Sequence, residues 1–278
     1  MPDRPTFDLT RHGFDLHCAG SEELAMAPHL VCVTGTRRAT PYGLALAEAS
    51  GRIVAESGHT LLTTAAMGCS ACAARAALDA GGDIIVMAAT GCNNPWPAMS
   101  TDVFERAGAT ISLATPDAPP TRSAFKSRDH ALAHIAETLV VCEAGVPSGV
   151  FSLADEMLDL EKRVLVFPGS VFSQTSTGAN ELIAHGATML TGPDALAAAL
   201  DPLHALTSPC ASSTESSPPD EVLRCLVASP MRPDDLARAL GVPVLDILRR
   251  LASYEMSGAV QRLPDGRYAH VPPSVRRT

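Results

Sequence analysis

The stretch HLVCVTGTRRATPYG, residues 29–43, decides the fold class of this chain. It begins with a short apolar run, typical of a strand buried on both faces, and this run ends at a Thr-Gly-Thr turn. Apolar residues at helical spacing follow from Leu44 to Ser57, and Gly58 then supplies the signal that ends a helix. We therefore predict a strand, a tight glycine turn and a helix in succession.

The same alternation continues to about residue 200. Short apolar runs, such as DIIVMAA at 83–89 and TLVVC at 138–142, alternate with helical segments, such as 69–80 and 128–136. Continuous apolar strands between helices indicate a mostly parallel sheet that is covered on both faces. The predicted fold class is α/β, with an extended Rossmann-like, doubly wound sheet over residues 28–200.

The regions outside this sheet have other patterns. Residues 1–27 are polar, and we expect an irregular N-terminal arm there. Residues 201–219 are rich in Pro, Ser and Thr, as flexible linkers are. From 220 to 278, three short helical segments precede two strands around the turn signal Pro-Asp-Gly at 264–266. Three helices followed by a hairpin predict a C-terminal winged helix-turn-helix.

Composition narrows the class of protein further. Hydrophobic residues make up 46% and charged residues 18% of the chain, which excludes a disordered protein. No run of about 18 apolar residues is present, so we expect no membrane span, and the N-terminus lacks an apolar secretory segment, which favours a cytoplasmic location. The net charge of -9 argues mildly against nucleic acid as a partner, although residues 218–278 carry nine Arg against seven acidic residues. Only 4% of residues are aromatic, so we expect little base stacking.

The eight cysteines are scattered, and several lie inside apolar runs. This pattern favours reduced thiols that pack as small hydrophobic groups. Cys69 and Cys72 have the spacing of a redox or metal motif, but no second ligand pair follows them. We expect no metal ion and no cofactor.

Loops that follow the strands are the expected ligand site, because helix N-termini and free amide groups meet at that edge of a parallel sheet. In the first loop Gly35 permits a tight turn, and Arg37 and Arg38 are permanent cations suited to phosphate. A surface Arg pair beside a turn is the alternative interpretation. The three-glycine fingerprint of dinucleotide binding is absent.

Three further loops contain small and hydroxyl residues. In the second, Gly68 either lets backbone amides approach an anion or permits close helix packing. In the third, Ser148 and Gly149 begin a helix, where the hydroxyl either binds phosphate or caps the helix. In the fourth, Gly169 marks the turn, and Asn180 at the next helix start either contacts a ligand or caps backbone.

In this order, the loops resemble the DNA-processing protein A family (DprA, also called Smf). The family's G-S-R and Y-G motifs appear as GTR at 35–37 and YG at 42–43. Its F-x-x-R-N-R element appears as FKSRDH at 125–130. Its V-P-G-S and G-x-N-x-L-I-x-x-G-A segments appear at 167–170 and 178–187. The predicted winged helix also resembles the usual C-terminal domain of this family.

The resemblance implies a protein without catalytic activity that binds single-stranded DNA without sequence preference, forms a homodimer and helps to load a RecA-type recombinase during natural transformation. It implies phosphate contacts by basic residues of the first loop and of the FKSRDH element, with Phe125 as the better stacking candidate. The expected nucleic-acid and phosphate-binding residues are Gly35, Thr36, Arg37, Arg38, Gly68, Phe125, Lys126, Arg128, Ser148, Gly149, Gly169, Ser170 and Asn180.

Two other functions stay open. The LOG phosphoribohydrolases, of the same superfamily, carry P-G-G-x-G-T-x-x-E. The segment PSGVFSLADE at 147–156 lacks the Gly-Gly pair and the Gly-Thr pair, so a nucleotide sensor is the alternative rather than a hydrolase. Met67, Ser70 and Ala74 stand where DprA proteins have Arg, Asp and His, which favours a regulatory scaffold. In that case the winged helix would bind a protein rather than DNA.

Overall fold

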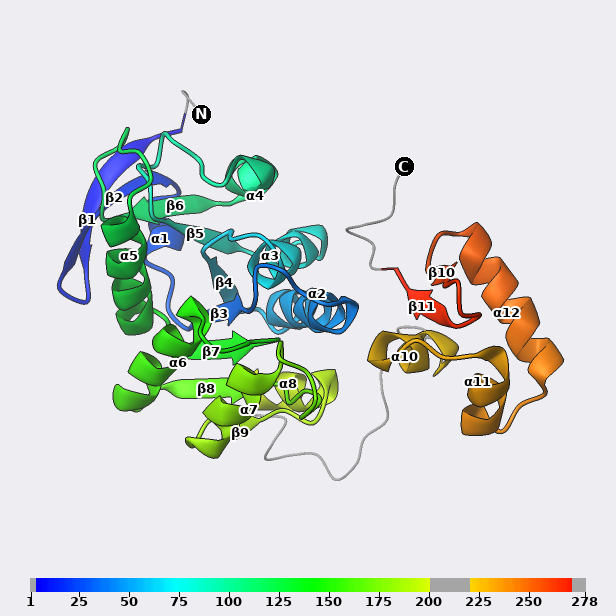
Figure 1. The fold of residues 1–278 in the computed structure, drawn as a ribbon. Helices are drawn as coiled ribbons and strands as arrows, with labels where there is room; N and C mark the ends of the chain where they lie inside the picture. The colour runs from blue at the N-terminus through cyan, green and yellow to red at the C-terminus, as the bar shows by residue number, and fades with distance from the viewer. Residues whose placement is uncertain (1–3, 201–220, 272–278) are drawn as a thin grey trace. The chain divides into compact units, whose positions relative to one another are not determined.

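A computed structural model describes residues 4–200 and 221–271 of the chain (Figure 1). The chain divides into two compact units, a larger one around a nine-stranded sheet and a smaller C-terminal one. Within the described ranges, none of the helices combines the length and apolar character needed to cross a membrane. The predicted linker, 201–219, lies outside the described residues.

The sheet is doubly wound, with the strand order β1-β2-β6-β5-β4-β3-β7-β8-β9. Strand β3 pairs in parallel with β4 on one side and with β7 on the other, so the winding direction reverses between β3 and β7. Doubly wound sheets bind ligands outside the carboxyl ends of the strands at such a reversal. The parallel strands are β3 (Leu30–Thr34), β4 (Thr60–Thr63), β5 (Ile84–Ala88), β6 (Ala109–Ser112), β7 (Thr138–Val141), β8 (Arg163–Val166) and β9 (Thr188–Met189).

Helices cover both faces of this sheet. Strands β3 and β5 are buried along their whole length, because helices α2 and α3 cover one face and α5 and α6 cover the other (Figure 1). The Rossmann-like, mostly parallel fold predicted from the apolar runs is therefore confirmed. The helices of this unit are α2 (Pro41–Glu56), α3 (Cys69–Asp79), α4 (Thr101–Arg106), α5 (Arg122–Ile135), α6 (Gly149–Asp159), α7 (Thr177–Ala184) and α8 (Pro193–Leu200).

The N-terminal region corrects one prediction. Strands β1 (Thr6–Arg11) and β2 (Phe14–Gly20) form an antiparallel hairpin, and β2 pairs antiparallel with β6 at the edge of the sheet; the short helix α1 (Glu22–Ala25) follows. The prediction of an irregular arm was wrong for these residues. Leu16 is buried in the main core, whereas β1 alternates exposed polar residues with partly buried ones, among them Phe7 and Leu9, which pack against that core. Pairing with β6, a segment about 90 residues away, stabilises the hairpin, and no local pattern in the sequence reports such pairing.

Helix α5 begins six residues earlier than the apolar spacing predicted. The Thr121 hydroxyl caps it by accepting a hydrogen bond from the Ala124 amide at 3.1 Å. The first turns contain mostly polar residues, whereas the buried residues are concentrated from Arg128 to Ile135. Periodicity therefore detected only the half of the helix that packs on the sheet.

The C-terminal unit is the predicted winged helix. Pro233 begins its second helix, and Gly241, with a φ of 66°, ends it in the left-handed conformation. Leu236 and Ile247 are fully buried at the centre of a small separate core. Its elements are α10 (Glu221–Ala228), α11 (Pro233–Leu240), α12 (Val244–Met256), β10 (Val260–Arg262) and β11 (Tyr268–His270), the two strands being antiparallel.

Candidate nucleic-acid interface

The loops after β3 and β7 meet where the winding of the sheet reverses. The Thr36 amide donates a hydrogen bond of 2.8 Å to the Glu143 carbonyl. A Cβ atom on Gly35 would lie 2.9 Å from the same carbonyl oxygen and 2.6 Å from Cys69 Sγ. Only glycine allows the two loops to approach so closely, which explains the glycine predicted to form this turn.

The loop after β4 packs against the first loop. Gly68 has a φ of +81°, and a Cβ atom there would lie 2.2 Å from the Thr36 carbonyl oxygen. Cys69 is the first residue of α3, and its amide donates a hydrogen bond of 3.3 Å to that same oxygen. Of the two roles predicted for Gly68, the structure shows close packing.

The loops after β7 and β8 are also joined. The Ala179 amide donates a 3.0 Å hydrogen bond to the Ala144 carbonyl. The Asn180 side chain accepts from the Gly169 amide and donates to the Gly169 carbonyl, both at 3.1 Å. Asn180 therefore caps backbone, one of its two predicted roles. All four predicted loops thus belong to one connected edge of the sheet.

The hydroxyl residues of these loops also stabilise the local backbone. Ser148 Oγ accepts a hydrogen bond of 3.3 Å from the Phe151 amide and caps α6. Ser170 Oγ accepts a hydrogen bond of 3.3 Å from the Phe172 amide and stays exposed. Gly149 is exposed at the start of α6, with open space around its α-carbon. A helix N-terminus with exposed amides attracts anions, so these residues stay candidates for phosphate.

The predicted cations fall into two groups. Arg37, Arg38 and Lys126 are exposed, and within the described residues no carboxylate forms an ion pair with any of them. Arg128, in contrast, is only 7% exposed, and its guanidinium donates two hydrogen bonds of 2.7 and 2.9 Å to Asp129. An arginine that is buried and already paired makes a poor phosphate contact, so the structure disfavours this role for Arg128.

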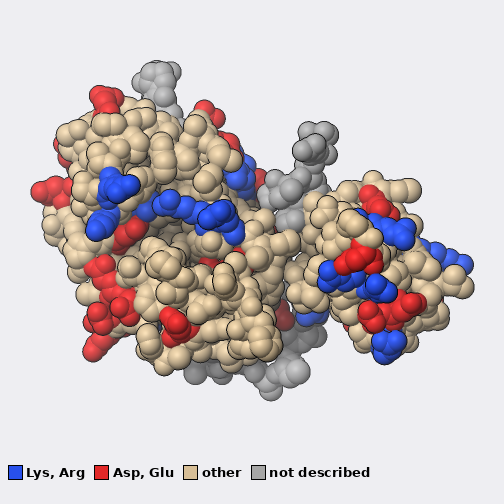
Figure 2. All heavy atoms as spheres, viewed as in Figure 1, with Lys and Arg blue, Asp and Glu red and all other residues tan. Residues whose placement is uncertain are grey.

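Basic side chains form a band on this face of the larger unit. Figure 2 shows Lys and Arg side chains in a row from the region of α5 toward the loops before α2 and α3. Acidic side chains lie above, beside and below this band, but few lie within it. The chain has a net negative charge, but this face is locally positive. A locally positive surface attracts a polyanion even when the net charge of the protein is negative.

Two aromatic residues of this edge were missed by the sequence analysis. Trp96, in the loop after β5, packs edge to face on Phe125 with 5.0 Å between ring centroids, and it is 39% exposed. The Arg128 guanidinium lies 5.4 Å from the centroid of the same Phe125 ring. Phe172, in the loop after β8, is 97% exposed. Both missed residues lie in loops that follow strands, and that position was the signal that could have identified them.

The fold and this edge define a Rossmann-like protein with a C-terminal winged helix and with exposed basic side chains on the first loop and on α5, at the carboxyl edge of its sheet. The family model of DNA recombination-mediator protein A matches residues 6–201, and the model of the DprA winged helix domain matches residues 207–266. The chain belongs to this DprA/Smf family.

Curated relatives and solved structures are similar to the chain to different extents. It is 30% identical over 172 residues to a putative DNA processing protein DprA of Mycobacterium tuberculosis, which covers 61% of this chain but only 44% of the relative. It is 27% identical over 268 residues to protein Smf of Escherichia coli, covering 91% of this chain and 69% of the relative. The chain therefore spans less than half the length of the mycobacterial relative.

Two solved structures share the fold. DprA from Streptococcus pneumoniae superposes with a TM-score of 0.64 at 23% identity, covering 71% of this chain and 74% of that chain. DprA from Helicobacter pylori, described for its single-stranded DNA binding mode, superposes with a TM-score of 0.65 at 23% identity, covering 71% and 95%. At this identity the superposition shows the fold alone.

Proposed function

We propose that the protein binds single-stranded DNA, without sequence preference, along the edge where its four loops meet. The observation that carries this proposal is the exposed pair Arg37 and Arg38, which directly follows the Thr36–Glu143 contact between the two central loops. Guanidinium groups bind phosphate through several donors at once. Family membership and the DNA-binding relative from Helicobacter pylori support the same ligand.

The strand would follow the basic band. Lys126 on α5 and the Arg pair of the first loop would contact successive phosphates, while the glycine corners would let the sugar-phosphate backbone approach the protein backbone. Trp96 and Phe125 would supply a small stacking surface for bases beside Lys126. This assignment gives the aromatic residues a larger part than their low number in the sequence suggested.

In the cell, we propose a role in DNA processing, uptake or recombination that involves no chemical step. The family description as a recombination mediator supports assistance in loading a RecA-type recombinase. A cytoplasmic homodimer is part of the same proposal, as the family resemblance implies. The experiment for this part is a strand-exchange assay with RecA and a single-strand binding protein. An unchanged lag time in the presence of the protein would contradict the loading role.

The DNA proposal is tested by fluorescence anisotropy with labelled oligo(dT) at several salt concentrations. Because each lost phosphate contact lowers the salt slope by about 0.7 for a single strand, Arg37→Ala with Arg38→Ala should lower it by about 1.4 and weaken binding about tenfold at low salt. Arg52→Ala is the matched control, because Arg52 lies on α2, eleven residues after its start, and already pairs with Glu48. No binding at low salt, or equal losses in both variants, would overturn the proposal.

A further inference from the structure

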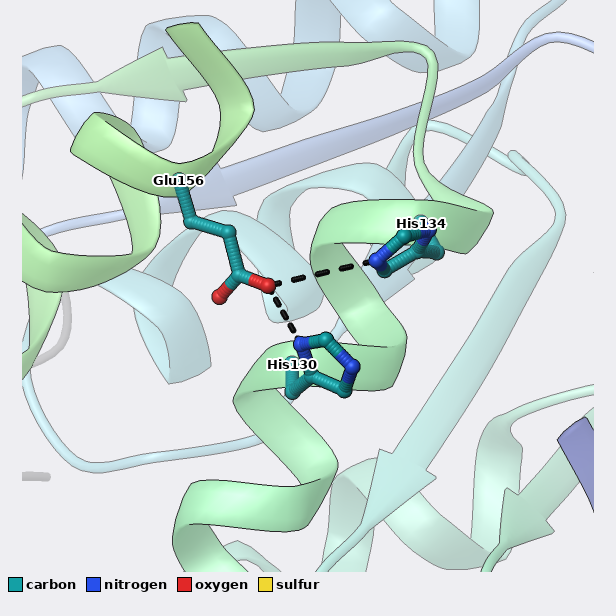
Figure 3. Close-up of side chains that lie close together, drawn as sticks. All are labelled: His130, His134 and Glu156. Atoms are coloured by element: carbon teal, nitrogen blue, oxygen red, sulfur yellow. Dashed lines mark hydrogen bonds and ion pairs between the residues drawn. The ribbon is translucent and has the colours of Figure 1, made fainter. Parts of the chain in front are cut away.

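Two histidines and a glutamate lie together on the face of the sheet that α5 and α6 cover, although the sequence suggested no metal ion. His130 and His134 are four residues apart on α5, so both point from the same side of the helix. Glu156 reaches toward them from the neighbouring helix α6 (Figure 3). Its Oε1 atom forms a short hydrogen bond with His130 Nδ1 and lies 4.0 Å from His134 Nε2.

We propose that His130, His134 and Glu156 bind a divalent ion of the first transition row, with Zn²⁺ as the ion best suited to them. Two imidazole nitrogens and one carboxylate oxygen are a familiar zinc ligand set, and they leave the fourth position open for water or another ligand. The three ligand atoms all lie within 4.8 Å of one another. The site is thus assembled from two separate helices before any ion arrives.

The distances fit an ion after small side-chain rotations. Bonds of about 2.0–2.1 Å in tetrahedral geometry place ligand atoms about 3.4 Å apart. The widest pair of ligand atoms would therefore approach by one to two ångströms, and the hydrogen-bonded pair would separate by about 1 Å. Side chains that are at least one-third exposed can make such rotations, and the exposed fractions here are 33% for His134 and Glu156 and 55% for His130.

The surroundings restrict the imidazole rings on one side. The Phe14 ring, from β2, lies 5.6 Å from the His130 ring and 5.5 Å from the His134 ring, measured between centroids. The two imidazole rings are themselves 4.8 Å apart. An apolar wall on one side limits the rotamers of the ligands and excludes water there, as the outer shell of a metal site does.

An ion held here would connect α5 with α6. The site adjoins the proposed DNA edge, because Lys126 lies one turn before His130 on the same side of α5. Because the ion binds the folded chain, it would raise the free energy of unfolding of the larger unit. The proposal does not depend on DNA binding, and its test uses no DNA.

The test is a titration of the full chain, purified with chelator and reductant and then dialysed, with ZnCl₂ by calorimetry and with Co²⁺ by visible absorption. We expect one equivalent of ion and a Co²⁺ spectrum from nitrogen and oxygen ligands, without the intense near-ultraviolet band of thiolate ligation. His134→Gln and Glu156→Gln should each weaken this equivalent at least about tenfold. His185→Gln is the matched control, because His185 is exposed at the end of α7 outside the cluster, and it should bind like the unaltered chain.

Circular dichroism without metal separates loss of binding from loss of folding in each variant. A folded variant that keeps full affinity would overturn the proposal, as would a thiolate band, since that would place the ion on cysteines. Absence of any stoichiometric binding by the unaltered chain would likewise overturn it, and the cluster would then be a histidine–carboxylate ion pair. Binding that is lost only in the cluster variants would support it.

Discussion

Single residues determine how closely the four loops approach one another. At Gly35 and Gly68 a side chain would collide with backbone atoms of a neighbouring loop, so these glycines are required by packing and not only by local flexibility. Gly58, in contrast, has a positive φ of +72° but open space around it. The two kinds of glycine look alike in the sequence and differ in the structure.

Gly68→Ala should therefore be more damaging than Gly58→Ala. Gly58→Ala should lower the free energy of unfolding by about 1 kcal/mol, the cost of a left-handed conformation for alanine. Gly68→Ala should lower it by at least about 2 kcal/mol, because the new methyl group must also displace the Thr36 carbonyl. The measurement is urea unfolding followed by fluorescence of Trp96, the single tryptophan, which lies in the larger unit. Equal losses in both variants would show that the loops do not pack as closely as described.

Trp96 also reports directly on the proposed DNA edge. Because its ring is partly exposed and packs on Phe125 beside Lys126, oligo(dT) binding should change its emission and protect it from acrylamide quenching. A fluorescence titration run in parallel with anisotropy checks this. Full binding by anisotropy with unchanged emission and unchanged quenching would show that the strand passes elsewhere.

At the scale of elements, the N-terminal hairpin extends the sheet beyond its parallel part. Its inner strand β2 pairs with β6, and the Leu16 side chain packs in the same core as α5 and α6 residues. On the outer strand β1 the exposed residues are Thr6, Asp8 and Thr10, and a polar, partly charged edge of this kind disfavours pairing with other chains. The hairpin is therefore an integral part of the larger unit.

Leu16→Ala should accordingly destabilise the larger unit by about 2–4 kcal/mol, the usual cost of a large cavity in a core. Leu9→Ala, on the partly exposed outer strand, is the matched control and should cost distinctly less. Urea unfolding monitored by Trp96 fluorescence measures both variants. A negligible change in the free energy of unfolding for Leu16→Ala would contradict the packing of the hairpin on the core.

The third helix of the winged helix, α12, combines two kinds of surface. Arg249 forms an ion pair of 3.2 Å with Asp246 on the same helix. Leu245 and Met256 are largely exposed on that helix. An ion-paired arginine between exposed apolar side chains suits a protein surface at least as well as a DNA groove, so both predicted roles of this unit stay open.

At the scale of the whole molecule, folding buries most of the thiols. Cys69 and Cys72 are both buried, like four other cysteines of the larger unit. Burial raises the pKa of the Cys32 and Cys142 thiols to about 12 and that of Cys72 to about 11. A thiolate, the reactive and metal-binding form, is therefore disfavoured in the folded protein, which agrees with the interpretation of the cysteines as small hydrophobic groups.

Native protein at pH 8 should expose at most two of its eight cysteines to a thiol reagent such as DTNB, and unfolding in urea should expose all eight. Cys225 is partly exposed, and Cys210 lies outside the described residues. Rapid reaction of three or more thiols without denaturant would show that at least one of the six buried cysteines of the larger unit is accessible.

The same thiols should make stability fall at alkaline pH. Between about pH 9 and 12 the unfolded chain has lost thiol protons that the folded chain retains, so unfolding releases protons and the free energy of unfolding decreases as pH rises. Urea midpoints measured from pH 7 to 10.5 should decline above pH 9. A midpoint that rises over this interval would contradict the raised thiol pKa values.

The sequence by itself determined the parallel sheet, its order of loops, the winged helix and the family, because apolar runs, turn residues and motif order are local properties of the chain. Only the tertiary structure decided that the N-terminal residues join the sheet, that Arg128 pairs with Asp129, and that Trp96 packs on Phe125. Only the packing of α6 against α5 brings Glu156 to His130 and His134. These features depend on contacts between residues far apart in the chain or on the burial of one side chain. A local sequence pattern reports neither long-range contacts nor burial.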